Sequence, residues 1–226
     1  MTNRAFFVTG TDTGSGKTIA SVGLLRAFRL AGLQAYGMKP VASGCVQTAE
    51  GLVSEDALEL IKNSSTRLPY SVVNPVALVQ PCSPNIAAQL ENREINIKEI
   101  VDAYEKIQKQ EGMIIVEGVG GWQTPVFGMS GLGALVKQLE LPVVLVVGLR
   151  LGCINHARLT CQSIRDEKLE IAGWIANQVV LDYAYTSQTI ACLQEALDCR
   201  LLGLIPYLRD SEPDKTRFSL DIGALP

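Results

Sequence analysis

The most informative part of the sequence is Gly10-Thr11-Asp12-Thr13-Gly14-Ser15-Gly16-Lys17-Thr18. The stretch follows an apolar run at residues 5–8 and precedes a helical pattern at residues 19–27. A strand, a glycine-rich turn that ends in Gly-Lys-Thr and a helix together predict a phosphate-binding loop. Five residues separate Gly10 from Gly16, so the first glycine lies one place earlier than in the common G-x-x-x-x-G-K-T spacing. A glycine-rich hairpin turn is the alternative, but it does not account for the flanking strand and helix.

A loop of this kind binds the phosphates of a nucleoside triphosphate. Its successive backbone N–H groups surround a β-phosphate, and the following helix adds about half a positive charge at its N-terminus. We expect Lys17 to reach the β- and γ-phosphates and the Thr18 hydroxyl to hold Mg²⁺. The residues expected to line the nucleotide through the rest of the loop are Asp12, Thr13, Gly14, Ser15 and Gly16.

Length and charge limit the class of protein. The 226 residues predict one domain over residues 1–226, and they carry a net charge of −3 without a basic tract. Binding to nucleic acid or to an anionic membrane therefore has no electrostatic support. The longest apolar run, residues 141–149, is far shorter than the ~20 residues of a membrane span and is typical of a buried strand.

The compartment follows from the N-terminus and the cysteines. The first residues lead directly into a predicted strand and leave no room for a signal peptide. The six cysteines contain no C-x-x-C pair, and with a single histidine they argue against a zinc site. We therefore expect a cytoplasmic protein with reduced thiols.

Predicted strands and helices alternate along the chain. Strands are expected at residues 4–9, 33–38, 112–117, 141–148, 171–177 and 201–205. Helices are expected at residues 17–31, from 54, from 83, at 95–110, from 151 to about 168, and at 184–197. Residues 69–84 are expected to be loop or extended chain, and residues 122–133 a mobile glycine-rich loop. This alternation predicts an α/β fold of the P-loop NTPase type, a mostly parallel sheet with helices on both faces.

Three charged residues are candidates for the site. Lys39 precedes a proline, so it belongs at a strand end, where ligands gather in parallel sheets, although a lone lysine is more often a solvated charge. Glu117 ends an apolar strand before a glycine-rich turn, as the acidic partner of a phosphate loop does, and a buried glutamate needs a partner such as Mg²⁺. Capping of a loop is the alternative for Glu117. Asp56 lies in the first turn of a predicted helix, where favourable interaction with the helix dipole explains it equally well. His156 has no acidic neighbour in sequence, and we assign it no acid–base role.

Six blocks of the chain together resemble the dethiobiotin synthetase family. They are residues 8–13 with 16–18, 39–44, 116–118, 151–156, 173–177 and 203–206. A phosphate loop alone indicates only a superfamily, whereas these blocks in this order are specific to the family. The resemblance implies a homodimeric enzyme that closes the ureido ring of dethiobiotin from 7,8-diaminononanoate, CO₂ and ATP with Mg²⁺.

The resemblance also implies roles for residues near the phosphates. It assigns Mg²⁺ to Thr18, Asp56 and Glu117, and so favours metal binding over helix capping as the role of Asp56. The residues expected to hold the carbamate, the diamine and the transferring phosphoryl group are Thr13, Lys17, Lys39 and Ser43. Cationic groups and Mg²⁺ suit this chemistry, because negative charge accumulates on oxygen when a carbamate attacks the γ-phosphate.

Further roles concern the base and the substrate tail. By resemblance, Asn177 reads the adenine edge and Pro206 flanks the base. The segment expected to bind the substrate carboxylate across the dimer interface contains Gly152, Cys153 and Asn155, with Tyr185 as its candidate partner. Two departures are visible: Gly14 stands where many members have glutamate, and residues 118–139 contain no acidic residue.

Two other classes with related folds are less compatible with the sequence. A partitioning-type regulatory ATPase carries a lysine early in its loop, within K-G-G-x-G-K-T, where this chain has Asp12. An ATP-dependent amidotransferase of cobalamin synthesis needs a glutaminase domain, for which the chain is too short. We therefore predict an enzyme that works without nucleic acid or membrane.

Overall fold

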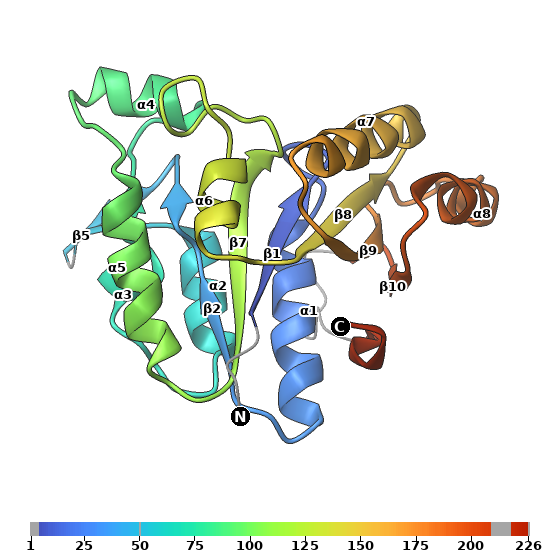
Figure 1. Ribbon diagram of the computed structural model, residues 1–226, viewed down its shortest axis with the longest axis horizontal. Coiled ribbons are helices and arrows are strands. Elements are labelled where there is room, and N and C mark those ends of the chain that lie inside the picture. Colours follow the sequence, from blue (N-terminus) through green and yellow to red (C-terminus); the bar gives the residue numbers. More distant parts are fainter. Residues whose placement is uncertain (1–4, 50, 209–217, 226) are drawn as a thin grey trace.

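A six-stranded parallel sheet forms the centre of the protein (Figure 1). The computed structural model describes residues 5–49, 51–208 and 218–225. The strands are β1 (Ala5–Gly10), β2 (Ala35–Met38), β7 (Met113–Gly121), β8 (Val143–Leu149), β9 (Ile171–Gln178) and β10 (Leu201–Ile205), in the order β10-β9-β8-β1-β7-β2. All neighbouring strands run parallel, so their carboxyl ends lie at one edge. The predicted sheet is confirmed, except that Arg4, expected to begin β1, lies outside the described residues.

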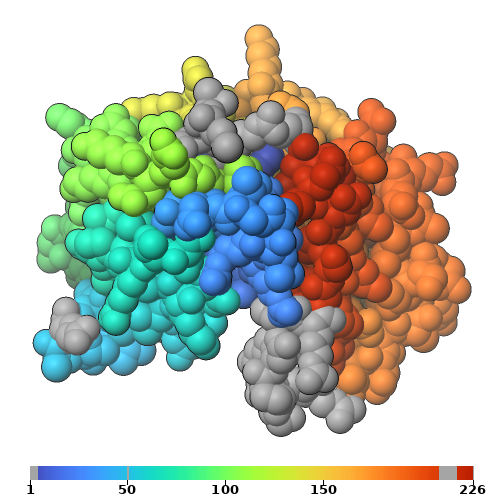
Figure 2. Space-filling view, turned by 90° about the horizontal axis from the view of Figure 1, so that it is seen from below, coloured from blue at the N-terminus to red at the C-terminus, as the bar shows by residue number. Residues whose placement is uncertain are grey.

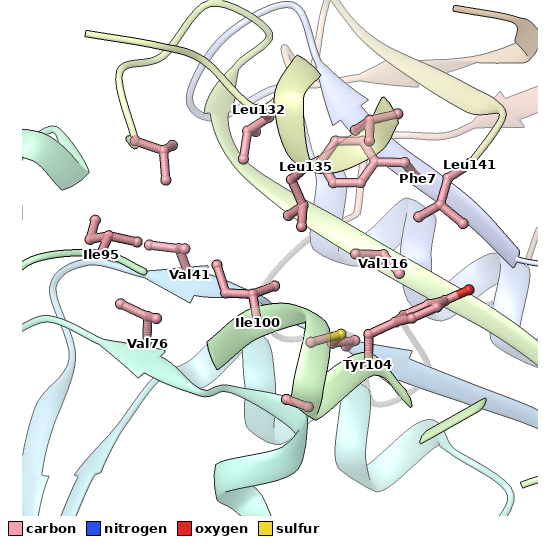
Figure 3. Packing of buried hydrophobic residues seen from close by; sticks show 14 of the residues in the cluster. Phe7, Val41, Val76, Ile95, Ile100, Tyr104, Val116, Leu132, Leu135 and Leu141 are labelled. Carbon is pink, nitrogen blue, oxygen red and sulfur yellow. The ribbon is translucent and has the colours of Figure 1, made fainter. Parts of the chain in front are cut away.

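Helices cover both faces of this sheet, as predicted. One face carries α1 (Lys17–Leu30) and α2 (Glu55–Asn63), and the other carries α5 (Ile97–Gln108), α6 (Gly133–Gln138), α7 (Cys153–Asp166) and α8 (Thr186–Leu197). Successive side chains of β1 point to opposite faces, since Phe6 and Val8 pack against α1 whereas Phe7 packs on the α5–α6 side. Figure 3 shows Phe7 near Leu135 of α6, with Tyr104 and Ile100 of α5 further along the same cluster.

The helix that follows the phosphate loop, α1, is largely buried from Lys17 to Phe28. Figure 2 views the molecule from the amino ends of the strands, where the blue end of α1 lies between green segments and the red C-terminal residues. Contacts with α2 and with the short 3₁₀-helix η1 (Ile222–Ala224) account for this arrangement. Leu24, Leu25 and Phe28 of α1 are buried in the same cluster as Leu220. The start of α1 therefore has a fixed position relative to the sheet.

Several short elements were not predicted. Residues 69–84 contain the one-turn helix α3 (Tyr70–Val73) and strand β6 (Val76–Ala77), whereas α4 (Pro84–Leu90) begins where the helix from residue 83 was predicted. Strand β6 pairs in parallel with β3 (Val41–Ala42), and β4 (Val46–Thr48) pairs with β5 (Gly51–Val53) in a hairpin. Elements of two to four residues leave no periodic signal, which is why the segment read as loop.

The glycine-rich segment at residues 122–133 differs from its expectation. It was expected to be mobile, but Trp122, Val126 and Leu132 are buried in the core, and α6 begins at its end. Glu167 at the end of α7 accepts a hydrogen bond from Trp122 Nε1 at 3.0 Å. The apolar side chains between the glycines thus anchor the segment to the core, a contact that the glycine pattern alone does not indicate.

The remaining sequence expectations concern thiols and membranes. All six cysteines are free. Within the described ranges, no helix combines the length and the apolar character that crossing a membrane requires.

Candidate active site

The phosphate loop connects the carboxyl end of β1 to α1, which begins at Lys17. Gly14 and Gly16 adopt φ angles of 80° and 88°, a left-handed conformation that suits glycine. A Cβ atom on Gly16 would overlap the amide of Asn177, whose Nδ2 donates to the Ser15 carbonyl at 2.9 Å. The Ser15 side chain is buried beneath the loop, next to Gly10. Any contact of Ser15 with a nucleotide is therefore made by its backbone.

Four residues from separate elements meet beside this loop. Thr18 Oγ1 lies 2.8 Å from Asp56 Oδ1 and 2.8 Å from Glu117 Oε1. The ammonium group of Lys39 lies 2.7 Å from Asp56 Oδ2 and 2.6 Å from Glu117 Oε1. Lys39 follows β2, Asp56 lies in the first turn of α2, and Glu117 belongs to β7. We call these four residues the Lys39 cluster.

Burial makes the charges of this cluster strongly interdependent. Lys39 is 2% exposed and Glu117 is fully buried. Burial opposes the positive charge of Lys39, but the carboxylates of Glu117 and Asp56 outweigh it and raise the lysine pKa. Burial likewise opposes the charge of Asp56, yet the neighbouring Lys39 ammonium holds the pKa of that carboxyl below its usual range. Lys39 is therefore a cation at neutral pH.

Lys17 lies at the edge of this cluster. Its ammonium donates to the Asp12 carbonyl at 3.1 Å. Burial, and next the charge of Lys39, lower the pKa of Lys17 from 10.5 to about 8. Two lysines thus face the position at which a loop of this type holds phosphates, and an anionic ligand there would neutralise their repulsion.

The oxygen ligands of the cluster fit Mg²⁺. Glu117 Oε2 is buried and has no hydrogen-bond partner among the described residues, so one hard oxygen remains available. Mg²⁺ prefers carboxylate, hydroxyl, water and phosphate oxygens, and it usually takes only one or two carboxylates from the protein. No group of three or more His, Cys, Asp or Glu residues that could hold a metal occurs in the described chain. Thr18, Asp56 and Glu117 therefore suit a metal that also binds nucleotide phosphates.

A pocket of about 780 Å³ opens above the loop. Its lining includes Thr13, Gly14, Gly16, Lys17, Thr18, Lys39, Ser43 and Asp56. Residues 81–84, 119–120 and 124–125 also line it. A Cβ atom at Gly14 would meet no atom within 4 Å, so the space beside this position is open. The structure thus brings Thr13, Lys17, Lys39 and Ser43 to one pocket, whereas Asp12 and Ser15 of the loop do not line it.

Asn177 near the end of β9 and Pro206 just after β10 lie at the same edge of the sheet. Ile205 pairs with Asn177, so Pro206 follows directly beside it. Asn177 is buried and its amide nitrogen already bonds the phosphate loop, whereas Pro206 is exposed. In this arrangement the side chain of Asn177 stabilises the loop in addition to any contact with a base.

The residues expected at the substrate tail lie elsewhere. Gly152 precedes α7 with a φ of 94°, Asn155 is exposed on the first turn, and Tyr185 is an exposed residue before α8. The side chain of Cys153 is buried in the core beneath α7. None of these four residues lines the pocket described above. Within one chain, the structure therefore does not bring them to the Lys39 cluster.

One contact at the loop was not anticipated from the sequence. Arg150, which follows β8, forms an ion pair with Asp12 of the phosphate loop. The only signal in the sequence was its position after a predicted parallel strand, at the edge where ligands gather. This ion pair connects the loop to the segment that begins α7.

Comparison with known proteins agrees with the fold and the loop. A family model described as "AAA domain" (AAA_26) matches residues 4–215. The chain superposes on a chain of the Aquifex aeolicus "MinC:MinD cell division protein complex" with a TM-score of 0.56 and 13% identity, covering 95% of this chain and 86% of that one. A ParA family ATPase from Chlorobium tepidum gives 0.53 and 15%, with coverages of 97% and 90%. The parallel sheet and its loop define a P-loop NTPase.

Similarity to curated proteins is much higher. The chain is 43% identical over 225 residues to the ATP-dependent dethiobiotin synthetase BioD of Cellvibrio japonicus, covering 100% of this chain and 99% of that protein. The proteins of the same name from Yersinia pestis (strain Angola) and Pseudomonas aeruginosa (strain UCBPP-PA14) are each 44% identical, covering 99% and 98% of this chain and 92% and 97% of their own lengths. The chain belongs to the ATP-dependent dethiobiotin synthetase family and is an ATP-dependent ligase.

Proposed function

We propose that this protein catalyses the Mg²⁺- and ATP-dependent carboxylation and ring closure of 7,8-diaminononanoate with CO₂, which yields dethiobiotin for biotin biosynthesis. The observation that carries the proposal is Lys39, a buried cation held at the phosphate loop by two carboxylates. We also propose that residues 1–226 form one domain, that the enzyme is cytoplasmic, and that neither nucleic acid nor membrane takes part.

In this proposal the phosphate loop holds ATP. Backbone N–H groups along residues 12–16 bind the β-phosphate, and Lys17 contacts the β- and γ-phosphates. Asn177 keeps the loop in place through its bond to Ser15 and faces the base together with Pro206. Thr18, Asp56 and Glu117 hold Mg²⁺. When bound, the metal neutralises charge on the phosphate oxygens and orients the γ-phosphate.

The reaction proceeds through two transfers. One amine of the diamine combines with CO₂ to give a carbamate, whose oxygen attacks the γ-phosphorus and releases ADP. The resulting carbamic–phosphoric anhydride is attacked at carbon by the second amine, which closes the ring and expels phosphate. Lys39 and Lys17 stabilise the negative charge that develops on the transferring oxygens. Thr13 and Ser43, which line the same pocket, orient the carbamate and the diamine.

We propose a homodimer to account for the tail-binding residues. The backbone at Gly152 and Cys153, with the side chains of Asn155 and Tyr185, lies away from the pocket of its own chain. In the proposed dimer it serves the pocket of a second copy. Two-fold pairing brings the same segment of each chain to the other.

The test measures phosphate release and dethiobiotin formation from ATP, with and without the diamine and bicarbonate. Turnover should require both, because an empty site offers no nucleophile in line with the γ-phosphate. Lys39→Ala should lose about 10²–10³-fold in turnover while ATP binding changes little, since the loop itself holds the phosphates. Lys62→Ala, an exposed lysine on α2, is the matched control and should behave as wild type. Phosphate release that is equal in all mixtures, or stimulated by DNA alone, contradicts the synthetase proposal.

A further inference from the structure

The backbone of Lys39 is held by the α3 turn. Lys39 lies between the end of β2 and the start of β3, outside the hydrogen-bond ladder of the central sheet. Its N–H donates to the Val73 carbonyl at 2.8 Å, and its carbonyl accepts from Asn74 Nδ2 at 2.7 Å. Buried main-chain polar groups need such partners. The α3 turn therefore fixes both sides of the peptide that carries the Lys39 side chain.

Asn74 is buried, and both ends of its amide are in use. Its nitrogen also lies 3.2 Å from the Val76 carbonyl, and its oxygen accepts a hydrogen bond from the Tyr70 hydroxyl at 2.8 Å. An amide with this set of partners has one orientation and cannot rotate without losing several bonds.

Tyr70 extends this connection to α2. Its hydroxyl accepts a hydrogen bond from the Ser54 N–H at 2.7 Å. Ser54 caps α2 only through a long contact, since its side-chain oxygen lies 3.5 Å from the Ala57 nitrogen. The bond to Tyr70 is thus the short contact at the helix start, two residues before Asp56. Burial raises the pKa of Tyr70, so its hydroxyl stays protonated and continues to donate to Asn74.

We propose that Tyr70 and Asn74 are positioning residues for the reaction. Together they form a relay of hydrogen bonds from the Ser54 N–H through Tyr70 and Asn74 to the Lys39 carbonyl. The relay sets the position of the strand end that carries Lys39 relative to the helix turn that carries Asp56. The inference rests on the proposed function in one respect, namely that Lys39 and Asp56 act on the transferring phosphoryl group.

The relay is electrically neutral, and neither of its residues lines the pocket. Its effect must therefore be geometric and must appear in turnover more than in ATP binding. Misplacement of a catalytic group by about 1 Å can cost up to about 10²-fold in rate. Loss of the relay frees both the Lys39 peptide and the first turn of α2, so the two charged groups lose their fixed separation of 2.7 Å.

Tyr70→Phe removes only the hydroxyl and is the central variant. Ser64→Ala is its matched control, because Ser64 is also buried and its Oγ accepts from the Gly37 N–H at 2.9 Å. That bond joins the same two elements, α2 and β2, at the end away from the pocket. Each variant loses one hydroxyl group that accepts a hydrogen bond from a main-chain N–H. If Tyr70 only stabilised the fold, the two variants should therefore affect turnover to a similar extent.

The measurements are thermal unfolding, turnover, affinity for Mg²⁺ with a non-hydrolysable ATP analogue, and hydrogen exchange of the Ser54 amide. We expect both variants to lose comparable thermal stability and to bind the analogue within about threefold of wild type. Only Tyr70→Phe should lose about tenfold or more in kcat and show faster exchange at Ser54. In the double variant Tyr70→Phe/Asn74→Ala, turnover should be no lower than in the less active of the two single variants. Either substitution alone already breaks the relay, so the second has nothing further to remove.

Two results would overturn the relay. One is a Tyr70→Phe enzyme whose kcat lies within twofold of Ser64→Ala. The other is a double variant whose losses multiply, which would make Tyr70 and Asn74 independent. If the wild-type enzyme makes no dethiobiotin, the proposed function fails separately. In that case two other quantities test the relay: the exchange rate of the Ser54 amide and the Lys39–Asp56 distance in the structure of Tyr70→Phe. If neither quantity differs from wild type, the relay is overturned.

Discussion

At the scale of single residues, the Lys39 cluster shows how the chain keeps four charges in a small volume. Lys39 of the cluster and the adjacent Lys17 supply two positive charges, and Asp56 and Glu117 supply two negative ones. Burial of ions costs several kcal/mol each unless partners compensate them, and removal of one partner leaves an uncompensated charge. The charges of these four groups are therefore balanced, and removal of one changes the electrostatic environment of the others.

This balance leads to a prediction for Asp56. Asp56→Asn removes one carboxylate that faces Lys39 and Thr18, so turnover should fall about 10²–10³-fold, equivalent to about 3–4 kcal/mol. The adjacent Glu55 is exposed in the same first turn of α2, and Glu55→Gln should retain wild-type turnover. The assay measures kcat for dethiobiotin formation at saturating Mg²⁺. If Asp56→Asn and Glu55→Gln had similar activity, Asp56 would have no role in turnover beyond its interaction with the helix dipole.

At the scale of elements, α5 contributes a buried ionisable group far from the pocket. Tyr104 is buried on this helix within the apolar cluster drawn in Figure 3. Burial raises its pKa from 10 to about 12. In the unfolded chain the tyrosine loses its proton near the ordinary value, so between these two pH values the folded state binds more protons than the unfolded state. The free energy of unfolding must therefore fall as pH rises through this window.

The corresponding test compares wild type with Tyr104→Phe. Below pH 10 the contribution of the raised pKa is fully present, and the difference in stability between the two proteins should be constant. Between pH 10 and 12 the wild type should lose up to about 3 kcal/mol relative to the variant. Urea unfolding at a series of pH values measures this difference. A constant difference up to pH 12 would mean that Tyr104 has solvent access in the folded state.

The elements also show what a sequence can reveal. The six sheet strands were predictable because each is an apolar run flanked by helical patterns, and the phosphate loop because its residues are contiguous. Lys39 and Glu117 could be placed from their positions at strand ends, since parallel strands bring those ends together. The Tyr70–Asn74 relay and the Arg150–Asp12 ion pair could not be predicted from the sequence, because they depend on tertiary contacts. Arg150 and Asp12 lie 138 positions apart in the chain. The four-residue helix α3 has no periodic pattern that would have revealed it.

At the scale of the whole molecule, exposed apolar side chains gather near the start of α7. Leu151 is 94% exposed, and Leu181 and Tyr185 beyond β9 are also exposed. These residues adjoin the segment that the proposed dimer uses for the substrate tail. Apolar side chains at this position are explained if a second chain covers them.

We therefore predict that Leu151→Asp weakens the dimer. An aspartate buried against an apolar partner surface carries a desolvation cost, so the dissociated fraction should rise and turnover should fall, while ATP affinity per chain stays near wild type. Leu30→Asp provides the control, because Leu30 at the end of α1 is also highly exposed, at 76%, and lies at the opposite edge of the sheet. Light scattering at assay concentrations measures the mass. A fully active wild-type monomer would exclude the shared site.

The strand order has a consequence for synthesis on the ribosome. Strands β1 and β2 are made first, yet they do not pair with each other, because β7 lies between them in the sheet. At about 5–20 residues per second, the nascent chain extends for roughly 4–17 seconds after β2 before β7 is complete. Throughout that interval, apolar strands wait without their partners and are available to chaperones or to aggregation. The nucleotide loop is thus translated well before its partner strand: Glu117 lies 99 residues after Thr18, so the Lys39 cluster can form only once β7 has been made.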